Sequence, residues 1–291
     1  MRVNYFDPKC DLFPYPLQTD NHYIIVKKNN GLIFDEHYHY VNRSFFFKIL
    51  QTLSRFVIVP IVFPLTHIRM GLKIEGKENL RKYKKLFKKG VISISNHVHM
   101  WDYLCIMNAI KPKRPHVLAW KTNLTGESAS LVRLVGGIPI PENNMKASLA
   151  FMMDVTHMLN HGGWLHICPE GSMWEYYRPI RPFKRGAAYL AIKADKPIIP
   201  FAFTYREPSK WRKKIFKQVA LLTLHVGEPL YVNKNLKGSE QEINLTHRMH
   251  EAVCKLAGFE PGENIYEPIY NNSHRIDYYT DTYGKNYKGS K

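Results

Sequence analysis

The chain has 291 residues, of which 45% are hydrophobic, and this is enough for one sizeable core in one or two domains. Its 42 Lys+Arg against 24 Asp+Glu give a net charge of +18, which implies an anionic partner: nucleic acid, an anionic membrane surface or an anionic cofactor. The four cysteines are far apart and none forms a C-x-x-C pair, which argues against a zinc site or a disulfide framework.

Residues 1–43 are polar and rich in turns, and we expect an irregular N-terminal extension. They contain no signal peptide, so a reducing cytoplasmic setting is the default. One cluster of acidic and imidazole side chains resembles a metal site, but no further ligands accompany it, so no metal is expected. Its members are Asp35, Glu36, His37 and His39.

Residues 44–70 are strongly apolar with the period of a helix. The ten residues from Phe56 to Leu65 carry no charge, which is about half of the roughly 20 apolar residues needed to span a bilayer. Pro60 and Pro64 are expected to break this run. We therefore expect a pair of interfacial or re-entrant helices that lie in one leaflet, with a buried helix hairpin as the alternative.

Residues 71–258 alternate between strand and helix patterns. Strands are expected at 71–76, 91–95, 116–120, 164–168, 197–204 and 219–226, and helices at 77–89, 100–110, 145–159, 183–193 and 242–256. This alternation predicts an α/β fold, a mostly parallel sheet flanked by helices, preceded by the membrane-associated helical segment. Residues 259–291 are expected to form a C-terminal tail.

The segment 77–89 combines one apolar stripe with many basic residues. It suits an anionic membrane surface or an ordinary solvated helix face. No recognised nucleic-acid motif accompanies it, so a nucleic-acid partner is not expected.

The first stretch with candidate chemistry holds His97 and Asp102, where the strand 91–95 leads into the helix 100–110. A histidine that takes a proton from a hydroxyl needs a carboxylate to fix its tautomer and stabilise its charged form. On one helix the two side chains would point about 140° apart, so they meet only if His97 lies in the preceding turn. His99 competes for Asp102 because it is only three residues away, and chance spacing is the remaining alternative.

The second stretch is the strand 164–168 and the turn after it, which contains Glu170, Gly171 and Ser172. A carboxylate and a glycine at a strand end place a polar group where backbone is free to approach a ligand. A plain turn after a core strand is the alternative. Ligands gather at the carboxyl ends of parallel strands, and both His97 and Glu170 follow strands.

Together these stretches resemble the glycerolipid acyltransferase family over about residues 71–258. The family's N-H-x-x-x-x-D block is matched by residues 96–102, its glycine-rich block by 136–140, its phenylalanine-proline-glutamate-glycine-threonine-like block by 168–172, and its apolar strand with proline by 197–200. The resemblance implies that His97 is a general base oriented by Asp102, without a protein nucleophile. Within the matched blocks we assign Asn96, Glu170 and Ser172 to substrate binding. We add Gly171, because glycine's permissive backbone lets nearby amides hold the oxyanion or the acceptor.

Two positions depart from the family pattern, Glu142 and Met173, because the family usually has basic residues there. Those basic residues are associated with holding the acceptor's phosphate, so their loss weakens the case for lysophosphatidic acid. The cations that follow could take over this role, and of these we assign Arg181 and Lys184 to substrate binding. The full set is Arg178, Arg181, Lys184 and Arg185, and a solvated or membrane-facing basic face is its alternative.

We therefore expect an O-acyltransferase that moves a fatty acyl group from a thioester to the hydroxyl of a lyso-glycerolipid such as 1-acylglycerol-3-phosphate. Acyl-CoA or an acyl carrier protein thioester would be the co-substrate, with no metal or other cofactor. The expected partners are the lipid acceptor and an anionic membrane surface, at the cytoplasmic face of a membrane, with monotopic or peripheral attachment. The alternatives are an acyltransferase with a non-phosphate acceptor such as a glycolipid, an inactive basic membrane-surface binding protein, and a nucleic-acid binder.

Overall fold

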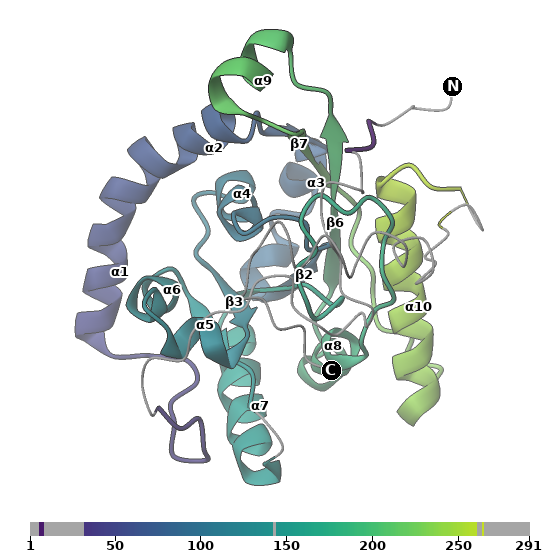
Figure 1. Cartoon of the computed structure of the whole chain (residues 1–291). Helices are drawn as coiled ribbons and strands as arrows, with labels where there is room; N and C mark the ends of the chain where they lie inside the picture. The colour runs from purple at the N-terminus through teal and green to yellow at the C-terminus, as the bar shows by residue number, and fades with distance from the viewer. Residues whose placement is uncertain (1–5, 9–31, 142–143, 261–263, 265–291) are drawn as a thin grey trace, which may run out of the picture.

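The computed structural model describes residues 6–8, 32–141, 144–260 and 264, and its centre is a seven-stranded sheet (Figure 1). The strands are β1 (Lys73–Glu75), β2 (Val91–Ile94), β3 (Pro115–Ala119), β4 (Gly137–Pro139), β5 (Trp164–Ile167), β6 (Ile198–Arg206) and β7 (Leu221–Val226). Their order across the sheet is β1-β7-β6-β2-β5-β3-β4. Every neighbouring pair is parallel except β6 with β7, which confirms the predicted mostly parallel α/β fold.

The two central strands that precede the candidate site end at the same edge of the sheet. β2 and β5 are parallel neighbours, with Ile94 opposite Ile167. Every residue of both strands is buried, as expected for the centre of a sheet covered on both faces. The segments that follow the two strands therefore begin beside each other.

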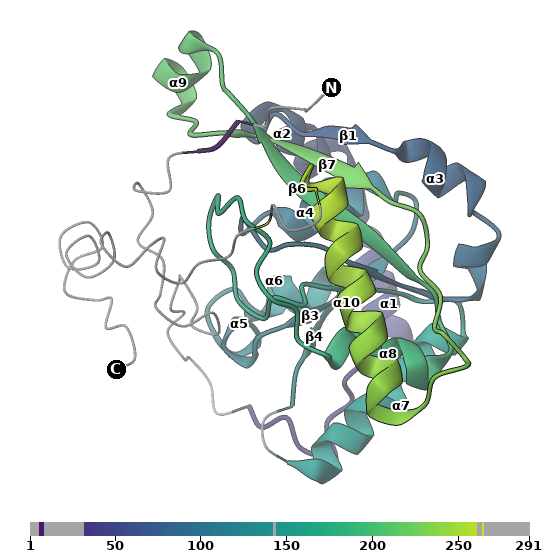
Figure 2. The same cartoon turned by 90° about the vertical axis from the view of Figure 1, so that its right-hand side faces the viewer.

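Helices cover both faces of the sheet (Figures 1 and 2). They are α3 (Lys77–Lys82), α4 (Asp102–Ala109), α5 (Lys121–Thr125), α6 (Ala129–Leu134), α7 (Met145–Asn160), α8 (Gly186–Ala194), α9 (Lys210–Phe216) and α10 (Gly238–Leu256), with a 3₁₀ turn at Leu86–Lys89. Ile92 of β2 shares a core with α7, α8 and α10, and Val91 shares the opposite core with Ile106 of α4. Alternate residues of one strand thus face different helical layers.

The apolar N-terminal segment forms one continuous helix. α1 (Phe45–Val57), a π-helical turn (Ile58–Val62) and α2 (Phe63–Arg69) follow each other without a gap. The prediction that Pro60 and Pro64 would break this run into two helices is wrong. Proline removes a backbone donor, and the wider π-helical turn around Pro60 lets the helix continue.

This helix is the one stretch of the described residues that is long and apolar enough to cross a membrane, by length and composition. Only 6% of its most apolar window is buried, so the alternative of a buried hairpin is wrong. Ile58 and Phe63 anchor it by packing against Met107 of α4. Most of its other apolar side chains are exposed, and only Phe47 and Val62 are half-buried.

Several element boundaries differ from the predictions. The expected helix at 77–89 is interrupted by a turn, and the helix expected to begin at residue 183 begins at Gly186. α5, α6, α9 and β4 were not predicted. Most of the predicted N-terminal extension and C-terminal tail, and Glu142, lie outside the described residues. The division of the chain into four parts therefore stays a prediction.

Candidate active site

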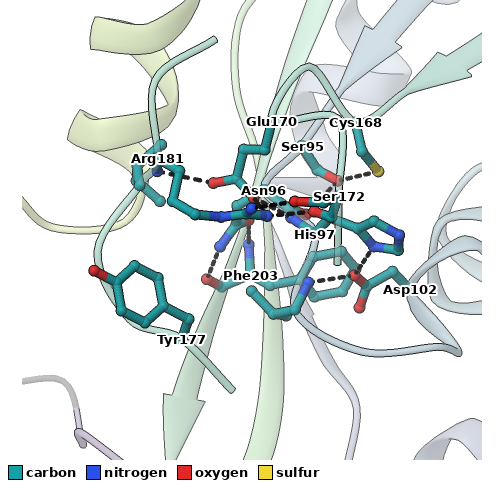
Figure 3. A network of polar contacts seen from close by, with 12 residues as sticks. Ser95, Asn96, His97, Asp102, Cys168, Glu170, Ser172, Tyr177, Arg181 and Phe203 are labelled. Atoms are coloured by element: carbon teal, nitrogen blue, oxygen red, sulfur yellow. Dashed lines mark hydrogen bonds and ion pairs between the residues drawn. The ribbon is translucent and has the colours of Figure 1, made fainter. Parts of the chain in front are cut away.

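His97 and Asp102 meet at the carboxyl end of β2 (Figure 3). His97 lies in the turn before α4, which begins at Asp102, and its Nδ1 is 3.0 Å from Asp102 Oδ2. The same oxygen accepts the backbone N–H groups of Val98 at 2.7 Å and His99 at 3.0 Å. The Asp102 carboxylate is 1% exposed, and the turn fixes it in place for the imidazole.

This contact sets the tautomer of His97. Because the carboxylate accepts, Nδ1 carries the hydrogen and Nε2 is left with a lone pair that can take a proton. The His97 side chain is 30% exposed, so a substrate can reach it. The competing His99 ring instead faces Glu175 at 3.5 Å and gives Asp102 only its backbone N–H.

The surroundings of His97 raise its pKa. Burial opposes the charged imidazolium and lowers the pKa of His97, but interactions with Cys168 and with the Asp102 carboxylate outweigh burial. A raised pKa makes the neutral form of His97 a stronger base, and it increases the fraction of His97 that is protonated in the free enzyme at a given pH. Proton abstraction by His97 should therefore become faster as pH rises.

Glu170 ties the two strand ends together. Its Oε2 accepts the backbone N–H of His97 at 2.9 Å, and its Oε1 accepts the backbone N–H of Arg181 at 2.9 Å. The Glu170 side chain is 2% exposed and points inward. It therefore holds the turn that carries the imidazole against the loop after β5.

Arg181 closes this network. Its Nη2 donates to Glu170 Oε2 at 2.7 Å and also to the Ser172 carbonyl, while its Nη1 donates to Ser172 Oγ at 2.6 Å. The guanidinium carbon lies 4.6 Å from the ring centroid of Trp174. Arg181 is 1% exposed and Ser172 is fully buried. This charge-assisted and stacked arrangement is typical of a buried structural guanidinium.

Asn96 fixes the turn from the other side. Its side-chain amide donates to the Phe203 carbonyl at 3.0 Å and accepts the Phe203 backbone N–H at 2.8 Å. Asn96 is 1% exposed, and Phe203 belongs to β6, the neighbour of β2. The Asn96 amide therefore ties the segment that follows β2 to the neighbouring strand β6.

Gly171 and Lys184 are the exposed members of the predicted substrate-binding set. Gly171 has a φ of +81°, and a Cβ there would come within 3.0 Å of Lys184 Nζ, so only glycine suits this turn. The Lys184 backbone N–H donates to the Pro169 carbonyl at 2.8 Å. Of the six residues predicted to bind substrate, these two present surface to a ligand. The other four are buried and bonded to protein groups: Asn96, Glu170, Ser172 and Arg181.

Cys168 belongs to the site, although the sequence reasoning did not place it there. The half-buried thiol lies 4.0 Å from Ser95 Oγ and 3.7 Å from His166 Nε2, and it interacts with His97. Burial, and then the charge of His97, lower the pKa of His166 to about 3, so His166 is neutral. One feature of the sequence could have indicated that Cys168 belongs to the site: it stands where the resembled family has phenylalanine.

Met173 stands where the resembled family usually has a basic residue. Its side chain is 8% exposed and belongs to the same core cluster as Trp174. Arg178 pairs with Asp7 at 3.8 Å, and Arg185 donates to a serine hydroxyl on α10 at 3.4 Å.

Comparison with known proteins identifies this region. Residues 71–204 match the family model described as Acyltransferase, and this range holds all eight predicted site residues, Asn96, His97, Asp102, Glu170, Gly171, Ser172, Arg181 and Lys184. The chain is 26% identical over 162 residues to 1-acyl-sn-glycerol-3-phosphate acyltransferase beta of Homo sapiens. This match covers 55% of this chain and 56% of the relative. These two matches support the predicted resemblance to the glycerolipid acyltransferase family.

The acyltransferase family implies an acyl donor and a lipid acceptor. The chain spans just over half the length of the human relative. A solved structure that is similar is that of the 1-acyl-sn-glycerophosphate (LPA) acyltransferase PlsC from Thermotoga maritima, with 15% identity, a TM-score of 0.44, and coverage of 72% of this chain and 77% of that one.

Proposed function

We propose that this acyltransferase moves a fatty acyl group from a thioester to the hydroxyl of a lyso-glycerolipid, with 1-acylglycerol-3-phosphate as the leading acceptor. The observation that carries the proposal is the 3.0 Å contact between His97 Nδ1 and Asp102 Oδ2, with the imidazole partly exposed at a strand end. The name of the human relative, which includes the same acceptor, supports it. The preserved contact also argues against an inactive binding protein.

In the proposed reaction, His97 Nε2 takes the proton of the acceptor hydroxyl as its oxygen attacks the thioester carbonyl. The new ester C–O bond forms, the C–S bond breaks, and the thiolate leaves with the proton that His97 returns. Asp102 stabilises the imidazolium in between. Glu170, Arg181 and Asn96 hold the turn in place, which keeps the base at a fixed distance from the reacting hydroxyl.

The donor in this proposal is acyl-CoA or an acyl carrier protein thioester. Coenzyme A carries phosphates and acyl carrier protein is acidic, so either suits a chain with a net charge of +18. Lys184 is an exposed cation beside Gly171 in the turn after β5, and we assign it to an anionic group of one of the two substrates.

A non-phosphate acceptor is the second candidate. It is favoured by the buried Met173, because the place where the family usually has a basic residue is apolar and closed here. A phosphate monoester prefers a bidentate arginine or backbone N–H groups, and the thioether side chain of Met173 is neither. A monoacyl glycolipid would not need the lost cation.

The helix Phe45–Arg69 supports a place on a membrane. Its outward face carries exposed aromatic and aliphatic side chains that water would not favour: Phe45, Phe46, Leu50, Leu53, Phe56, Val57, Ile61 and Ile68. We propose that this face lies in one leaflet of a membrane on its cytoplasmic side, which would bring the enzyme to a lipid acceptor.

The test is product formation with purified protein in detergent or liposomes, read by mass spectrometry. Acyl-CoA and acyl carrier protein thioester are each paired with lysophosphatidic acid, other lysophospholipids and a monoacyl glycolipid. An acylated product from lysophosphatidic acid supports the leading acceptor, and a product from the glycolipid alone supports the second. No product from any pair contradicts the proposed function.

A further inference from the structure

Helix α9 presents apolar side chains to the outside. It is a short excursion between β6 and β7 that stands away from the sheet (Figures 1 and 2). Trp211 is 54% exposed and Ile215 is 66% exposed. Their spacing of four residues places both side chains on one face of the helix. The Trp211 ring is supported by Phe216, with ring centroids 5.8 Å apart, and by the Arg212 guanidinium at 5.2 Å.

This helix is fastened to the end of the long apolar helix. Arg212 Nη1 donates to the Ile68 carbonyl at 3.0 Å, and Arg69 Nη1 donates to the Phe216 carbonyl at 3.0 Å. Gln218, just after α9, donates to the Ile68 carbonyl at 3.4 Å. Ile68 itself is 51% exposed. The apolar surface of the helix Phe45–Arg69 therefore continues onto α9.

The charges around this surface select an anionic partner. α9 and the residue after it carry five cations: Lys210, Arg212, Lys213, Lys214 and Lys217. One acid, Glu207, lies close by and pairs with Lys213 at 2.6 Å. An aromatic residue and an aliphatic residue surrounded by lysines are typical of a segment at a membrane–water interface, where rings sit at headgroup level and lysines meet anionic lipids.

We propose that α9 is a second lipid contact of this protein, which inserts Trp211 and Ile215 into the headgroup region of an anionic membrane. This inference rests on the proposed membrane location of the helix Phe45–Arg69. A single helix lying in a surface leaves the attached body free to roll about the helix axis. A second contact beyond the end of that helix stops the roll and fixes the direction in which the candidate site faces.

Intrinsic fluorescence tests the contact directly. The chain has five tryptophans, and Trp211 is the exposed one, whereas Trp101 and Trp120 are half-buried and Trp164 and Trp174 are buried. Vesicles of phosphatidylcholine with phosphatidylglycerol should shift the emission to shorter wavelength, because the exposed indole leaves water. The W211F variant should lack this shift. An unchanged wild-type spectrum under conditions where the protein is bound to the vesicles overturns the proposal.

Vesicle cosedimentation of a double variant gives the second readout. Replacing Trp211 and Ile215 by serine should weaken binding about tenfold or more, because two interfacial side chains are lost. The matched control replaces Leu149 and Met153 of α7 by serine. These two residues have the same spacing and are 59% and 73% exposed. Helix α7 lies at the other end of the molecule from α9 (Figure 1). The control should bind like wild type. The proposal is overturned if the α9 double variant binds vesicles as tightly as wild type. It is also overturned if the control variant loses as much vesicle binding as the α9 double variant.

Two further measurements separate the possible failures. Acyl transfer to a detergent-solubilised acceptor should be unchanged in the α9 double variant, so loss of lipid binding is distinguished from loss of catalysis. If no acyl transfer is found but the fluorescence shift is, the proposed reaction fails and the lipid contact stands. Sedimentation without lipid compares the oligomeric state of wild type and the α9 double variant. A dimeric wild type and a monomeric variant would mean that this face binds a second copy of the chain, which would overturn the proposal.

Discussion

One carboxylate oxygen of Asp102 receives three donors, the His97 imidazole and two backbone N–H groups, and all of them lie within seven residues of chain. The position of α4, which begins at Asp102, also favours a negative charge there, because the helix N-terminus is positive. The carboxylate is therefore held ready by local structure before any substrate arrives. Its other oxygen has no partner among the described residues.

Substituting Asp102→Asn should lower kcat by about 10²–10⁴-fold, because a neutral amide neither fixes the His97 tautomer nor stabilises imidazolium. The measurement is steady-state acyl transfer at saturating acceptor, with thermal unfolding as the control for folding. A variant that keeps wild-type kcat would show that the contact is structural.

The thiol of Cys168 gives a pH-dependent prediction. Cys168 helps to raise the pKa of His97, so Cys168→Ala should lower that pKa. Activity that needs the neutral imidazole rises with pH through the pKa of His97, and the rising limb should move to lower pH in the variant. A kcat/KM profile against pH checks this. A profile that stays in place or moves to higher pH contradicts it.

Residue roles were only partly accessible from the sequence. The pairing of His97 with Asp102 follows from local geometry, since only a turn before the helix lets the two side chains meet. The inward direction of Glu170 depends on Arg181, a partner eleven residues further along the chain that no local pattern indicates. The assignment of Glu170 to substrate binding followed the resemblance, and that of Arg181 followed its place among the cations downstream of Met173. The contacts of both side chains fit a positioning role instead.

At the scale of elements, the loop after β5 is held by the buried pair of Glu170 and Arg181. Substituting Arg181→Met leaves a buried carboxylate without its charged partner, which should lower the free energy of unfolding by about 3–5 kcal/mol. Denaturant unfolding measures the loss. The exposed Lys184 offers a matched control, because Lys184→Met should change stability little. Equal stability of the two variants would argue against a structural pair.

The apolar helix gives a prediction of its own. Phe46 and Phe56 are 81% and 74% exposed, so replacing either by serine should leave folding intact and weaken vesicle binding. Full burial of such a side chain is worth about 1.5–3 kcal/mol, or roughly tenfold or more in affinity. Met145, 81% exposed on α7, is the matched control. Wild-type binding by the Phe46 and Phe56 variants, or an equal loss in the Met145 control, would contradict a membrane role for this helix.

Periodicity predicted the elements that are long and regular, and it failed where backbone geometry is unusual. The six expected strands are all present. The central strands β2, β5, β6 and β7 are buried, largely apolar runs, which give the clearest strand signal. Pro60 was expected to end a helix, but a π-helical turn accommodates it. α9 is seven residues long and half cationic, which is too short for a periodic signal.

For the whole molecule, the net charge of +18 implies that membrane binding depends on salt and on lipid charge. Cosedimentation with anionic vesicles should weaken steeply as the Debye length falls from about 30 Å at 0.01 M to about 3 Å at 1 M salt. Vesicles of phosphatidylcholine alone should bind less and vary little with salt. Vesicle binding that is independent of both salt and lipid charge would contradict a role of the basic surface in membrane binding.

A comparison of two histidine variants decides whether His97 is the base of the proposed acyl transfer. Acylated product is measured for wild type, His97→Ala and His99→Ala with the acceptor that wild type uses best. His99 lies in the same turn but its ring faces Glu175, so it is the matched control. We expect His97→Ala to lose activity about a hundredfold or more, and His99→Ala to lose much less. Full activity of His97→Ala, or equal losses in both variants, would contradict this role of His97.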